Sequence, residues 1–535
     1  MQRDDENSAA TTLPALLHER ARTHAESDAI LAPGHAPASY GQLLENVARI
    51  GADLRACGLE RGARVAVVLP NGPEMAVTFL AITAAGMACA PLNPAYRREE
   101  LDFAFADLHA TALILAAEQA SPAADAARAL GIEVLRLHAR NDGVAGAARI
   151  HRDGRSSPAR TSGLDGDARD DAGAHATPSM NGAHPQDVAL LLHTSGTTSR
   201  PKLVALTQQN LAQSASTIAA MLRLQPSDRC LNIMPLFHVH GLVGAMLASL
   251  AAGASVVCTP GFDALRFSRW LRELAPTWYT AVPTMHQAIL ARAARDPDAL
   301  RATSLRFVRS CSAALQPGLM AELESAFAVP VVEAYGMTEA THQISCNPLP
   351  PARRKPGSVG VPTGVEVAVA AQDGRLLARG ETGEIVLRGG GVISRYESPP
   401  EANETSFVAG WFRTGDRGHV DEDGYVHLTG RLKEIINRGG EKISPAEIDA
   451  VLCEHPAVAQ AVAFAVPNDQ LGEEVGAAVV LRDGATADVK ELRSYLASRM
   501  AQFKVPRRIV IVTEIPKGPT GKLQRIGLAQ RLGLV

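Results

Sequence analysis

Hydroxyl groups, a glycine and a lysine are gathered in one short segment that follows the apolar run DVALLLH. From Thr194 to Lys202, the nine residues TSGTTSRPK include five hydroxyl side chains. Hydroxyls and turn-exposed backbone N–H groups suit phosphate oxygens, and a lysine adds a point charge. The spacing is not that of a Walker A loop, because Lys202 has no glycine before it and no Ser or Thr after it. The segment alone is also typical of a solvated turn.

A second segment, EAYGMTEATH from Glu333 to His342, overlaps the end of the apolar run VPVVEAY. Ligands of α/β proteins bind at strand ends. A carboxylate beside a hydroxyl, as in Thr338 and Glu339, suits Mg²⁺ held against a triphosphate. The same residues also fit the start of a helix capped by Thr338. For this segment alone both interpretations stay open.

Two further segments carry charged groups on glycine turns. Asp416 in TGD and Arg431 in GRLKE could hold the two hydroxyls of a ribose, although each is also typical of a surface turn. Lys522 in PKGPTGK lies on a Gly/Pro loop near the C-terminus, where an isolated lysine is usually an ordinary exposed residue. Taken singly, none of the three predicts a catalytic site.

The elements that must position these segments alternate between strand and helix. ARVAVVLP at residues 63–70 is predicted to be a buried strand from its β-branched content, and residues 73–88 are predicted to be a helix. Such alternation predicts a mostly parallel sheet covered by helices. Beyond residue 359, short strands with glycine turns predict a β-rich subdomain. After Arg431, a compact α/β domain of about 100 residues follows.

Two segments stand out from this pattern. Residues 140–186 nearly lack large apolar side chains and are predicted to be a disordered insertion. Ser444 to Glu447, SPAE, is predicted to be a capping box that starts a helix running to about residue 455. The predicted fold class is α/β. A large N-terminal domain of parallel-rich sheets plus a β-rich subdomain spans residues 1–431, and a small, mobile α+β domain spans 432–535.

The composition is that of a globular protein. The 535 residues carry 53 Lys+Arg and 56 Asp+Glu, and a net charge of −3 argues against nucleic acid or an anionic membrane as the main partner. The seven cysteines form no C-x-x-C pair, which favours a reducing compartment. The most apolar stretch, residues 241–258, is predicted to be a buried helix running into a strand. With a polar N-terminus that is no secretory signal, a cytoplasmic protein is expected.

In their order and spacing, the four segments resemble the adenylate-forming superfamily of acyl-CoA synthetases, adenylation domains and beetle luciferases. The resemblance runs from about Leu13 to the end, apart from residues 140–186. It implies ATP, Mg²⁺ and CoA as cofactors or co-substrates and a small-molecule acid as substrate. It also implies a C-terminal domain that rotates about a hinge at Lys433 between two half-reactions. A monomer or homodimer is expected.

The resemblance implies roles for individual residues. In the family, the Ser/Thr/Gly loop holds the β- and γ-phosphates, and the matching residues here are Thr194, Ser195, Gly196, Thr197, Thr198 and Lys202. The positions that match the adenine-lining segments are Ser312, Ala313, Glu333, Ala334 and Tyr335. The family usually has glycine in place of Ser199 and Leu203, so the loop is expected to be stiffer here.

Further roles concern the reacting groups. Thr338 matches the α-phosphate contact, Glu339 the Mg²⁺ ligand, and Asp416 and Arg431 the ribose clamp. Lys522 matches the lysine that enters the site for adenylation, and Lys433 matches the hinge pivot. After rotation, the residues expected to contact CoA are Arg438, Gly439, Gly440 and Lys442, with the glycines leaving room for a pantetheine arm.

The acyl pocket is expected to draw on His238, Ser310 and His342, with Arg309 adjacent in sequence. Long or aromatic acids need an apolar tunnel, whereas imidazoles and serines suit the second carboxylate of a small, doubly charged acid. His240 is expected to be structural, because His238 and His240 have no third metal ligand nearby in the sequence.

The amino-acid sequences of segments such as HTSGTTSRPK and AYGMTEATHQISCNPLP resemble those of the oxalate–CoA ligase branch of the family. That branch implies the conversion of oxalate, ATP and CoA to oxalyl-CoA, AMP and pyrophosphate through an acyl-AMP intermediate. Three alternatives stay open. They are another short-chain or aromatic acyl-CoA ligase acting on malonate or a 4-coumarate-like acid, an adenylation domain that loads a carrier protein, and a non-catalytic regulator.

Overall fold

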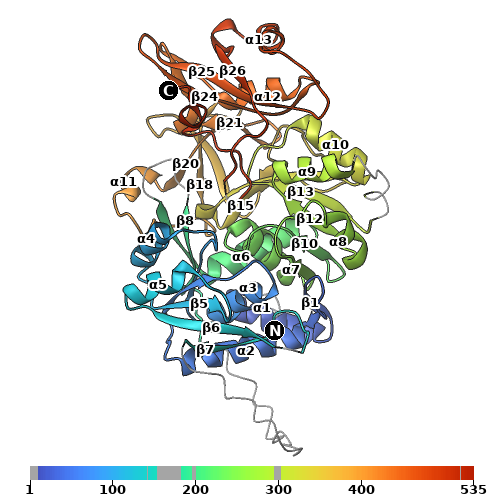
Figure 1. Cartoon of the computed structure of the whole chain (residues 1–535), viewed down its shortest axis with the longest axis vertical. Helices are drawn as coiled ribbons and strands as arrows, with labels where there is room; N and C mark the ends of the chain where they lie inside the picture. The colour runs from blue at the N-terminus through green and yellow to red at the C-terminus, as the bar shows by residue number, and fades with distance from the viewer. Residues whose placement is uncertain are drawn as a thin grey trace, which may run out of the picture. The chain divides into compact units, whose positions relative to one another are not determined.

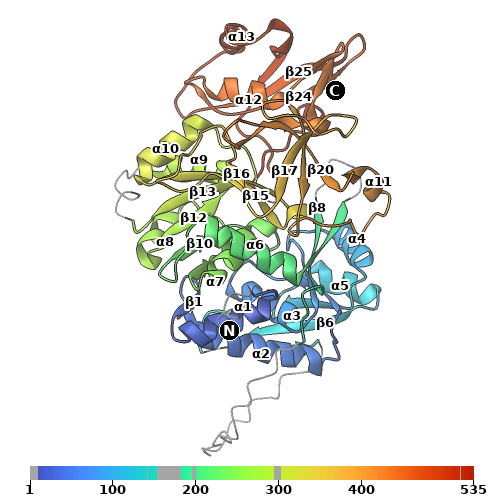
Figure 2. The same ribbon diagram turned by 180° about the vertical axis from the view of Figure 1, so that it is seen from behind.

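The structure is a computed structural model that describes residues 10–140, 142–153, 182–194, 201–293, 300, 303–518 and 520–535. The chain forms two compact units, and Figures 1 and 2 show it from opposite sides. Unit 1 comprises Met1–His193, Leu203–Ala219 and Leu224–Gly261, and unit 2 comprises Thr194–Lys202, Ala220–Arg223 and Phe262–Val535. The boundary predicted between residues 431 and 432 lies inside unit 2 and stays a prediction. No described helix combines the length and the apolar character that crossing a membrane requires.

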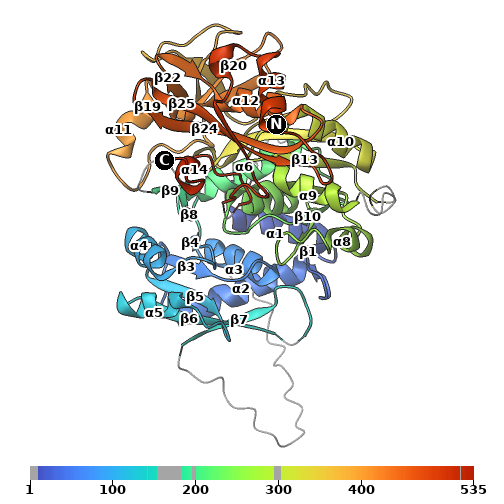
Figure 3. The same cartoon turned by 45° about the horizontal axis from the view of Figure 1, so that its top comes forward.

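Unit 1 is built around a sheet with the strand order β7-β6-β5-β3-β4-β8-β9. The pairs of β3 with β4 and β5, of β4 with β8 and of β5 with β6 are parallel, as the alternation predicts. Helices α2 and α3 run next to each other along the sheet (Figure 3). The elements of this layer are α2 (Tyr40–Ala56), β3 (Arg64–Val68), α3 (Pro73–Ala84), β4 (Ala88–Pro91), α4 (Arg98–Leu108), β5 (Ala112–Ala116), α5 (Pro122–Ala129), β6 (Glu133–Ala139), β7 (Ala148–Arg152), β8 (Val188–Thr194), β9 (Lys202–Thr207) and α6 (Gln208–Met221).

A second group of strands in unit 1 follows the order β10-β11-β1-β2. The apolar stretch 241–258 forms the π-helix η1 (His240–Leu247), α7 (Ala248–Ala251) and β11 (Ser255–Cys258), whose residues are all buried. The predicted buried helix running into a strand is confirmed. The remaining elements are α1 (Leu13–His24), β1 (Asp28–Leu31), β2 (Ala38–Ser39) and β10 (Arg229–Asn232).

The prediction that residues 140–186 form a disordered insertion is wrong near the start of this segment. Residues Ala148–Arg152 form β7, which pairs antiparallel with β6. Arg149 of this strand forms an ion pair with Asp53 of α2 at 2.8 Å. A strand of five residues is too short to alter a composition averaged over the whole segment, so the sequence pattern hid it. Residues 154–181 lie outside the described residues, and the prediction for them stays a prediction.

Unit 2 provides the strands that carry most of the predicted site residues. Its first sheet segment follows the order β12-β13-β14-β15-β16, with parallel pairing from β12 to β14 and antiparallel pairing from β14 to β16. The predicted strand VPVVEAY is β14. The elements here are α8 (Phe267–Leu274), β12 (Trp278–Ala281), α9 (Pro283–Ala293), β13 (Phe307–Cys311), α10 (Pro317–Phe327), β14 (Val331–Met337), the 3₁₀ turn η3 (Thr338–Ala340), β15 (His342–Cys346) and β16 (Val361–Pro362).

A sheet of antiparallel strands, β17-β18-β20-β19 with β21 beside β20, follows in the same unit. It confirms the predicted β-rich subdomain. Its elements are β17 (Glu366–Ala370), β18 (Gly383–Arg388), α11 (Ala402–Ser406), β19 (Phe407–Val408), β20 (Trp411–Val420), β21 (Val426–Arg431) and the 3₁₀ turn η4 (Leu432–Glu434).

The C-terminal part has a sheet and a hydrophobic core of its own. The sheet follows the order β23-β22-β25-β24, with β26 beside β25, and helices α12 and α13 pack with it. The predicted α/β fold class with a separate C-terminal domain is confirmed. The elements are β22 (Ile436–Arg438), β23 (Glu441–Ile443), α12 (Pro445–Cys453), β24 (Val458–Asn468), β25 (Gly472–Leu481), α13 (Val489–Ala497), the 3₁₀ turn η5 (Gln502–Lys504), β26 (Arg508–Ile511) and α14 (Leu528–Arg531).

Helix α12 begins where it is predicted, but not for the predicted reason. Pro445 occupies its first position, yet the Ser444 side chain forms no cap hydrogen bond. The Ser444 hydroxyl instead donates to the carbonyl oxygen of Thr429 on β21. The predicted capping box is therefore wrong, because an acceptor on a neighbouring strand takes the place of the local backbone.

Candidate functional site

Glu333 lies in the middle of β14, with Ser310 on β13 as its register partner. The residue is only 4% exposed, and its Oε1 accepts a hydrogen bond from the Leu315 backbone N–H at 2.8 Å. Burial raises the pKa of the Glu333 carboxyl from 4.5 to about 8, despite this hydrogen bond. The protonated form is therefore favoured at neutral pH, and it carries one O–H donor in addition to its acceptor oxygens. Its contact with adenine stays a prediction.

Glu333→Gln is expected to remove a pH dependence of folding stability. The native state keeps the Glu333 proton up to a pH of about 8, whereas the unfolded chain releases it near the ordinary pKa of 4.5. The native state thus binds more protons in this window. Stability therefore falls as the pH rises through it, by about 1.4 kcal/mol for each unit of pKa difference. Urea unfolding at several pH values should show the variant gaining a few kcal/mol on the wild type between about pH 4 and pH 8, and almost nothing below pH 4.

Glu273→Gln is a matched control, because Glu273 is an exposed carboxylate on α8. This variant should keep the pH dependence of the wild type. If Glu333→Gln and the wild type show parallel stability curves from acid to alkaline pH, the raised pKa of Glu333 is contradicted.

Asp416 on β20 and Arg431 at the end of β21 are direct cross-strand partners. Arg431 Nε lies 2.9 Å from Asp416 Oδ1, and the Tyr335 hydroxyl of β14 donates to Asp416 Oδ2. Asp416 is 4% exposed, and its charge raises the pKa of the Arg431 guanidinium. The fold thus brings together three residues that the sequence places in two separate segments. Both carboxylate oxygens keep a further lone pair for a hydroxyl donor.

Glu339 belongs to the turn η3 directly after β14 and is 7% exposed. The Tyr396 hydroxyl donates to Glu339 Oε1 at 2.7 Å, and Lys202 Nζ lies 4.2 Å from the centre of the Tyr396 ring. Burial lowers the pKa of Lys202, and so does Lys433, while Glu339 raises it. Lys202, predicted from the first segment, therefore lies in the electrostatic neighbourhood of Glu339, predicted from the second.

The surroundings of Glu339 fit a magnesium ion that also contacts phosphate. The Tyr396 hydroxyl bonds only Oε1 of this carboxylate among the described residues, so further lone pairs are available to a cation. Among the described residues, no group of three or more His, Cys, Asp and Glu side chains could hold a metal ion. Mg²⁺ in nucleotide sites is usually held by one or two carboxylates together with substrate phosphates. One carboxylate, that of Glu339, is therefore enough protein ligand for a magnesium ion that also binds phosphate.

Lys522 lies in electrostatic range of these groups. Burial lowers the pKa of its ammonium group, and Arg431 lowers it further. Cys311, Asp416 and Glu339 act in the opposite direction. The sequence alone could not distinguish this lysine from an exposed one. In the structure its pKa responds to the predicted ribose and magnesium residues.

The loop that carries Lys522 is docked on helix α9. The Thr284 hydroxyl donates to the carbonyl oxygen of Gly521 at 2.7 Å. Gln287, one turn further along α9, donates to the Ala459 carbonyl oxygen at 3.0 Å and accepts from Gln460 at 2.9 Å. The Thr284 bond fixes the Lys522 loop directly, whereas the two Gln287 bonds join α9 to β24.

His342 opens β15 after the turn η3 and is 1% exposed. The β14–β15 hairpin requires Gly336, because a Cβ at that position would lie 1.7 Å from the His342 carbonyl oxygen. His342 has a positive φ of 93°, which breaks the usual strand alternation. Both His342 and Gln343 consequently reach the same guanidinium. Arg309 Nη2 lies 3.2 Å from His342 Nε2 and 2.8 Å from Gln343 Oε1.

Arg309 is the candidate whose importance the sequence interpretation missed. Successive residues of a strand point to opposite faces, and the register of β13 pairs Arg309 with Thr280 and Ser310 with Glu333. Ser310 therefore faces away from the Arg309–His342 contact. Its hydroxyl is buried and has no hydrogen-bond partner among the described residues. The one available signal was a basic residue inside the buried strand FVRSC.

The phosphate loop is described only at its two ends. Thr194 ends β8 and Lys202 begins β9, and the Thr194 hydroxyl donates to the Lys202 carbonyl oxygen at 3.4 Å. The predicted contacts Ser195, Gly196, Thr197 and Thr198 lie outside the described residues.

Four other predicted residues lie in or directly after β13 and β14. Ser312 follows β13 with a positive φ of 74°, and Ala313 beside it is exposed. Ala334 is buried in β14 and pairs with Cys311. Thr338, the predicted α-phosphate contact, begins η3 and is half-buried.

His238 and His240 belong to unit 1. The His240 backbone N–H donates to His238 Nδ1 at 3.3 Å, and the His240 side chain is fully buried in η1. His238 is half-buried. The predicted cooperation of His238 with His342 stays a prediction.

The segment predicted to contact CoA is the β22–β23 hairpin. Lys433 is exposed in η4, just before it, and Lys442 is exposed on β23. Gly439 and Gly440 have φ values of 58° and 94°, so the two-residue turn requires the left-handed conformation at both positions. This geometry explains the glycines without a bound pantetheine.

Arg438, also on this hairpin, is held by Glu474, which lies 2.6 Å from its Nε. The roles of the hairpin residues in CoA binding stay predictions.

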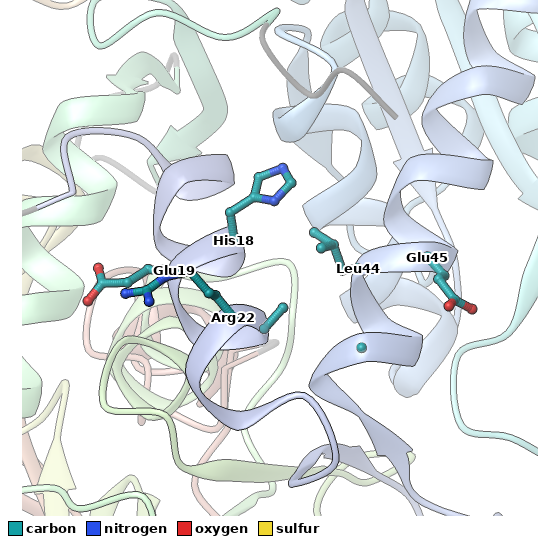
Figure 4. A pocket seen from close by; sticks show the side chains of 7 residues that line it. His18, Glu19, Arg22, Leu44 and Glu45 are labelled. Carbon is teal, nitrogen blue, oxygen red and sulfur yellow. The ribbon is translucent and has the colours of Figure 1, made fainter. Parts of the chain in front are cut away.

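A depression on the surface of unit 1 lies between α1 and α2. Figure 4 shows side chains of His18, Glu19 and Arg22 from α1 and of Leu44 and Glu45 from α2 around it. None of the residues predicted for the site lines this depression.

Two family patterns match the chain. The pattern described as AMP-binding enzyme matches residues 17–397, and that of the AMP-binding enzyme C-terminal domain matches residues 447–522. An oxalate–CoA ligase of Arabidopsis thaliana is 43% identical over 97% of this chain and 98% of its own. A sulfoacetate–CoA ligase of Cupriavidus necator is 36% identical over 97% of both chains. The crystal structure of ATP-bound MatB from Rhodopseudomonas palustris matches with a TM-score of 0.82 and 30% identity, over 96% of this chain and 97% of that one.

Proposed function

The chain belongs to the AMP-binding enzyme family, and from that premise we propose that this AMP-forming CoA ligase makes oxalyl-CoA from oxalate, ATP and CoA. The family resemblance predicted from the four segments is thereby confirmed. The observation that carries the choice of acid is the setting of His342. This fully buried imidazole contacts an arginine rather than an apolar lining, and Gln343 bonds the same arginine. The high identity to an oxalate–CoA ligase supports the same choice.

The first half-reaction joins the acid to the nucleotide. One carboxylate oxygen of the acid attacks the α-phosphorus in line, the bond to the β-phosphate oxygen breaks, and acyl-AMP and pyrophosphate result. The chain's part is to position the reactants and to neutralise phosphate charge. Thr338 contacts the α-phosphate, Asp416 and Arg431 hold the ribose hydroxyls, and Lys522 balances the developing charge. Glu339 would hold Mg²⁺, which supplies further charge neutralisation when bound.

The second half-reaction transfers the acyl group. The CoA thiolate attacks the acyl carbon, the bond to the AMP phosphate oxygen breaks, and AMP leaves. For this step the C-terminal domain turns about Lys433. The hairpin with Arg438, Gly439, Gly440 and Lys442 then faces the acyl-AMP in place of Lys522.

A panel of acids tests the proposal. AMP formation that depends on both ATP and CoA should be measured with oxalate, malonate, sulfoacetate, acetate, 4-coumarate and octanoate. Strong selectivity for oxalate supports the proposed substrate. Preference for 4-coumarate or octanoate makes the polar interpretation of the acyl pocket wrong while the family assignment stands. Absence of AMP with every acid contradicts the catalytic assignment.

His342→Ala is expected to raise the Michaelis constant for oxalate about tenfold or more, because a hydrogen bond to a charged group contributes roughly 1.5–3 kcal/mol. The Michaelis constant for ATP should stay unchanged, since His342 lies apart from the Asp416–Arg431 pair in sequence and bonding. Steady-state kinetics with each substrate varied in turn provide the measurement.

His286→Ala is the matched control for this variant. It removes another fully buried imidazole of unit 2, whose Nδ1 lies 3.1 Å from the Tyr279 hydroxyl. The control reports the damage caused by a buried cavity next to the Arg309 backbone, with the contact between Arg309 and His342 left in place. Oxalate kinetics that are equal in His342→Ala and the wild type would refute the role of His342.

A further inference from the structure

Arg309 is a buried cation without a carboxylate partner among the described residues. Its exposed fraction is zero, and none of the described groups that its guanidinium bonds is a carboxylate. Nη1 donates to the Thr280 hydroxyl at 3.3 Å, and Nη2 donates to Gln343 Oε1 and His342 Nε2 at 2.8 and 3.2 Å. Its Nε has no hydrogen-bond partner in the described part of the chain. A guanidinium keeps its positive charge in proteins, so a net charge stays in this interior.

Another arginine of unit 2 shows how the chain balances such a charge elsewhere. Arg525 is paired with Glu434 at 3.0 Å and with Asp449 at 2.6 Å. Burying a charge is costly unless an opposite charge and hydrogen bonds compensate it. If only folding stability mattered, a paired carboxylate would be expected beside Arg309 as well. No described carboxylate compensates the charge of Arg309, so a bound anion could supply the opposite charge.

The connection of Arg309 to the acyl site runs through His342. Because Arg309 Nη2 donates to His342 Nε2, that nitrogen is an acceptor, and Nδ1 carries the imidazole proton. The positive φ of His342 and the close approach at Gly336 hold the ring in this orientation. Strands β12, β13 and β15, which supply the cluster, lie in one sheet, as Figure 2 shows. Arg309 therefore orients the donor of His342 and adds a positive charge behind it.

We propose that Arg309 is a specificity-determining positioning residue, whose uncompensated charge, acting through His342, selects acids that carry a second anionic group. The proposal rests on the proposed function and names its substrate class: small dianionic acids. It makes the second negative charge, rather than the size of the acid, the feature that is recognised.

The test compares oxalate with oxamate, in which an amide replaces the second carboxylate at nearly the same size. The ratio of kcat/KM for the two acids is measured from AMP release in the full-length wild type, Arg309→Gln and Arg309→Lys. The wild type should prefer oxalate at least tenfold. Arg309→Gln keeps hydrogen-bonding capacity without charge and should lose most of that preference through a higher KM for oxalate. Arg309→Lys keeps the charge and should retain most of it, with KM for ATP unchanged in both variants.

Gln343→Glu provides a second variant that leaves the arginine in place. It sets a carboxylate where Gln343 Oε1 now accepts from Arg309 at 2.8 Å, and so neutralises the guanidinium internally. The preference for oxalate over oxamate should fall at least tenfold. Thermal denaturation shows which variants fold. If Arg309 variants do not fold, Gln343→Glu decides the question.

Several results would overturn the proposal. They are equal use of oxalate and oxamate by the wild type, and an unchanged ratio in Arg309→Gln or Gln343→Glu. The substrate proposal can fail separately. If malonate is used instead of oxalate, the pair malonate and malonamate tests Arg309 in the same way. An intact charge preference there would sustain the inference without oxalate.

Discussion

Lys522→Ala should reduce acyl-AMP formation by about 100-fold or more while leaving thioester formation from supplied acyl-AMP nearly intact. Removing one preorganised group that stabilises transition-state charge typically lowers turnover by about 10²–10³-fold. Lys522 lies in electrostatic range of Arg431, Asp416 and Glu339, which are the residues proposed to hold the ribose and the magnesium ion. In the proposed second half-reaction AMP is the leaving group, and the proposed domain rotation withdraws the lysine.

The two half-reactions are measured separately, as pyrophosphate release from ATP and oxalate and as oxalyl-CoA formation from oxalyl-AMP and CoA. Lys517→Ala is the matched control. Lys517 lies on the same loop, is exposed, and pairs with Glu514 at 3.3 Å. This variant should keep both activities. An equal loss of both half-reactions in Lys522→Ala would contradict the assignment of Lys522 to adenylation.

Asp416→Asn should lower kcat/KM for ATP by about 100-fold. Asp416 accepts from Arg431 and from Tyr335 on its two oxygens. An asparagine must turn its NH₂ group toward one of these donors, so one hydrogen bond is lost and the charge with it. Hydrogen bonds to charged groups contribute roughly 1.5–3 kcal/mol each, and the ribose contact is lost in addition.

Steady-state kinetics with varied ATP measure this effect, and thermal denaturation separates it from loss of folding. Asp373→Asn is the control, because Asp373 is an exposed turn residue that accepts only from the Arg375 backbone N–H. It should match the wild type. An unchanged kcat/KM for ATP in Asp416→Asn would remove Asp416 from the nucleotide site.

The helices and strands of the fold could be predicted from the sequence because they depend on local residue patterns. The strand predicted at residues 63–70 and the helix predicted at 73–88 follow from β-branched content and from length and alanine content. Both elements are confirmed, but the helix ends at Ala84 and Ala88 already begins β4. Short or tertiary features were missed. β7 has only five residues inside a polar segment, and the Ser444 hydroxyl bonds Thr429 on another strand rather than capping α12.

The residues of the candidate site could be predicted from the sequence, but the contacts between them could not. Glu339, Asp416, Arg431 and Lys522 were predicted from the resemblance of four ordered segments to the adenylate-forming superfamily. The hydrogen bonds of Asp416 to Arg431 and Tyr335 could not be predicted from the sequence. They depend on the register of β20 with β21 and on the approach of β14. Arg309 was noted only as a neighbour of the predicted acyl pocket, because its contacts with Thr280, His342 and Gln343 depend on the pairing of separate strands.

The sequence by itself determined the family, the layered α/β architecture and the residue types that do the chemistry. These follow from hydrophobic periodicity and from motifs that are each contained in about ten residues. Only the tertiary structure decided which charges meet. Tyr335 and Asp416 are 81 positions apart, and Arg309 and His342 are 33 positions apart. Such contacts arise from strand order and register, and the electrostatic energy of a buried charge depends on them rather than on its neighbours in the chain.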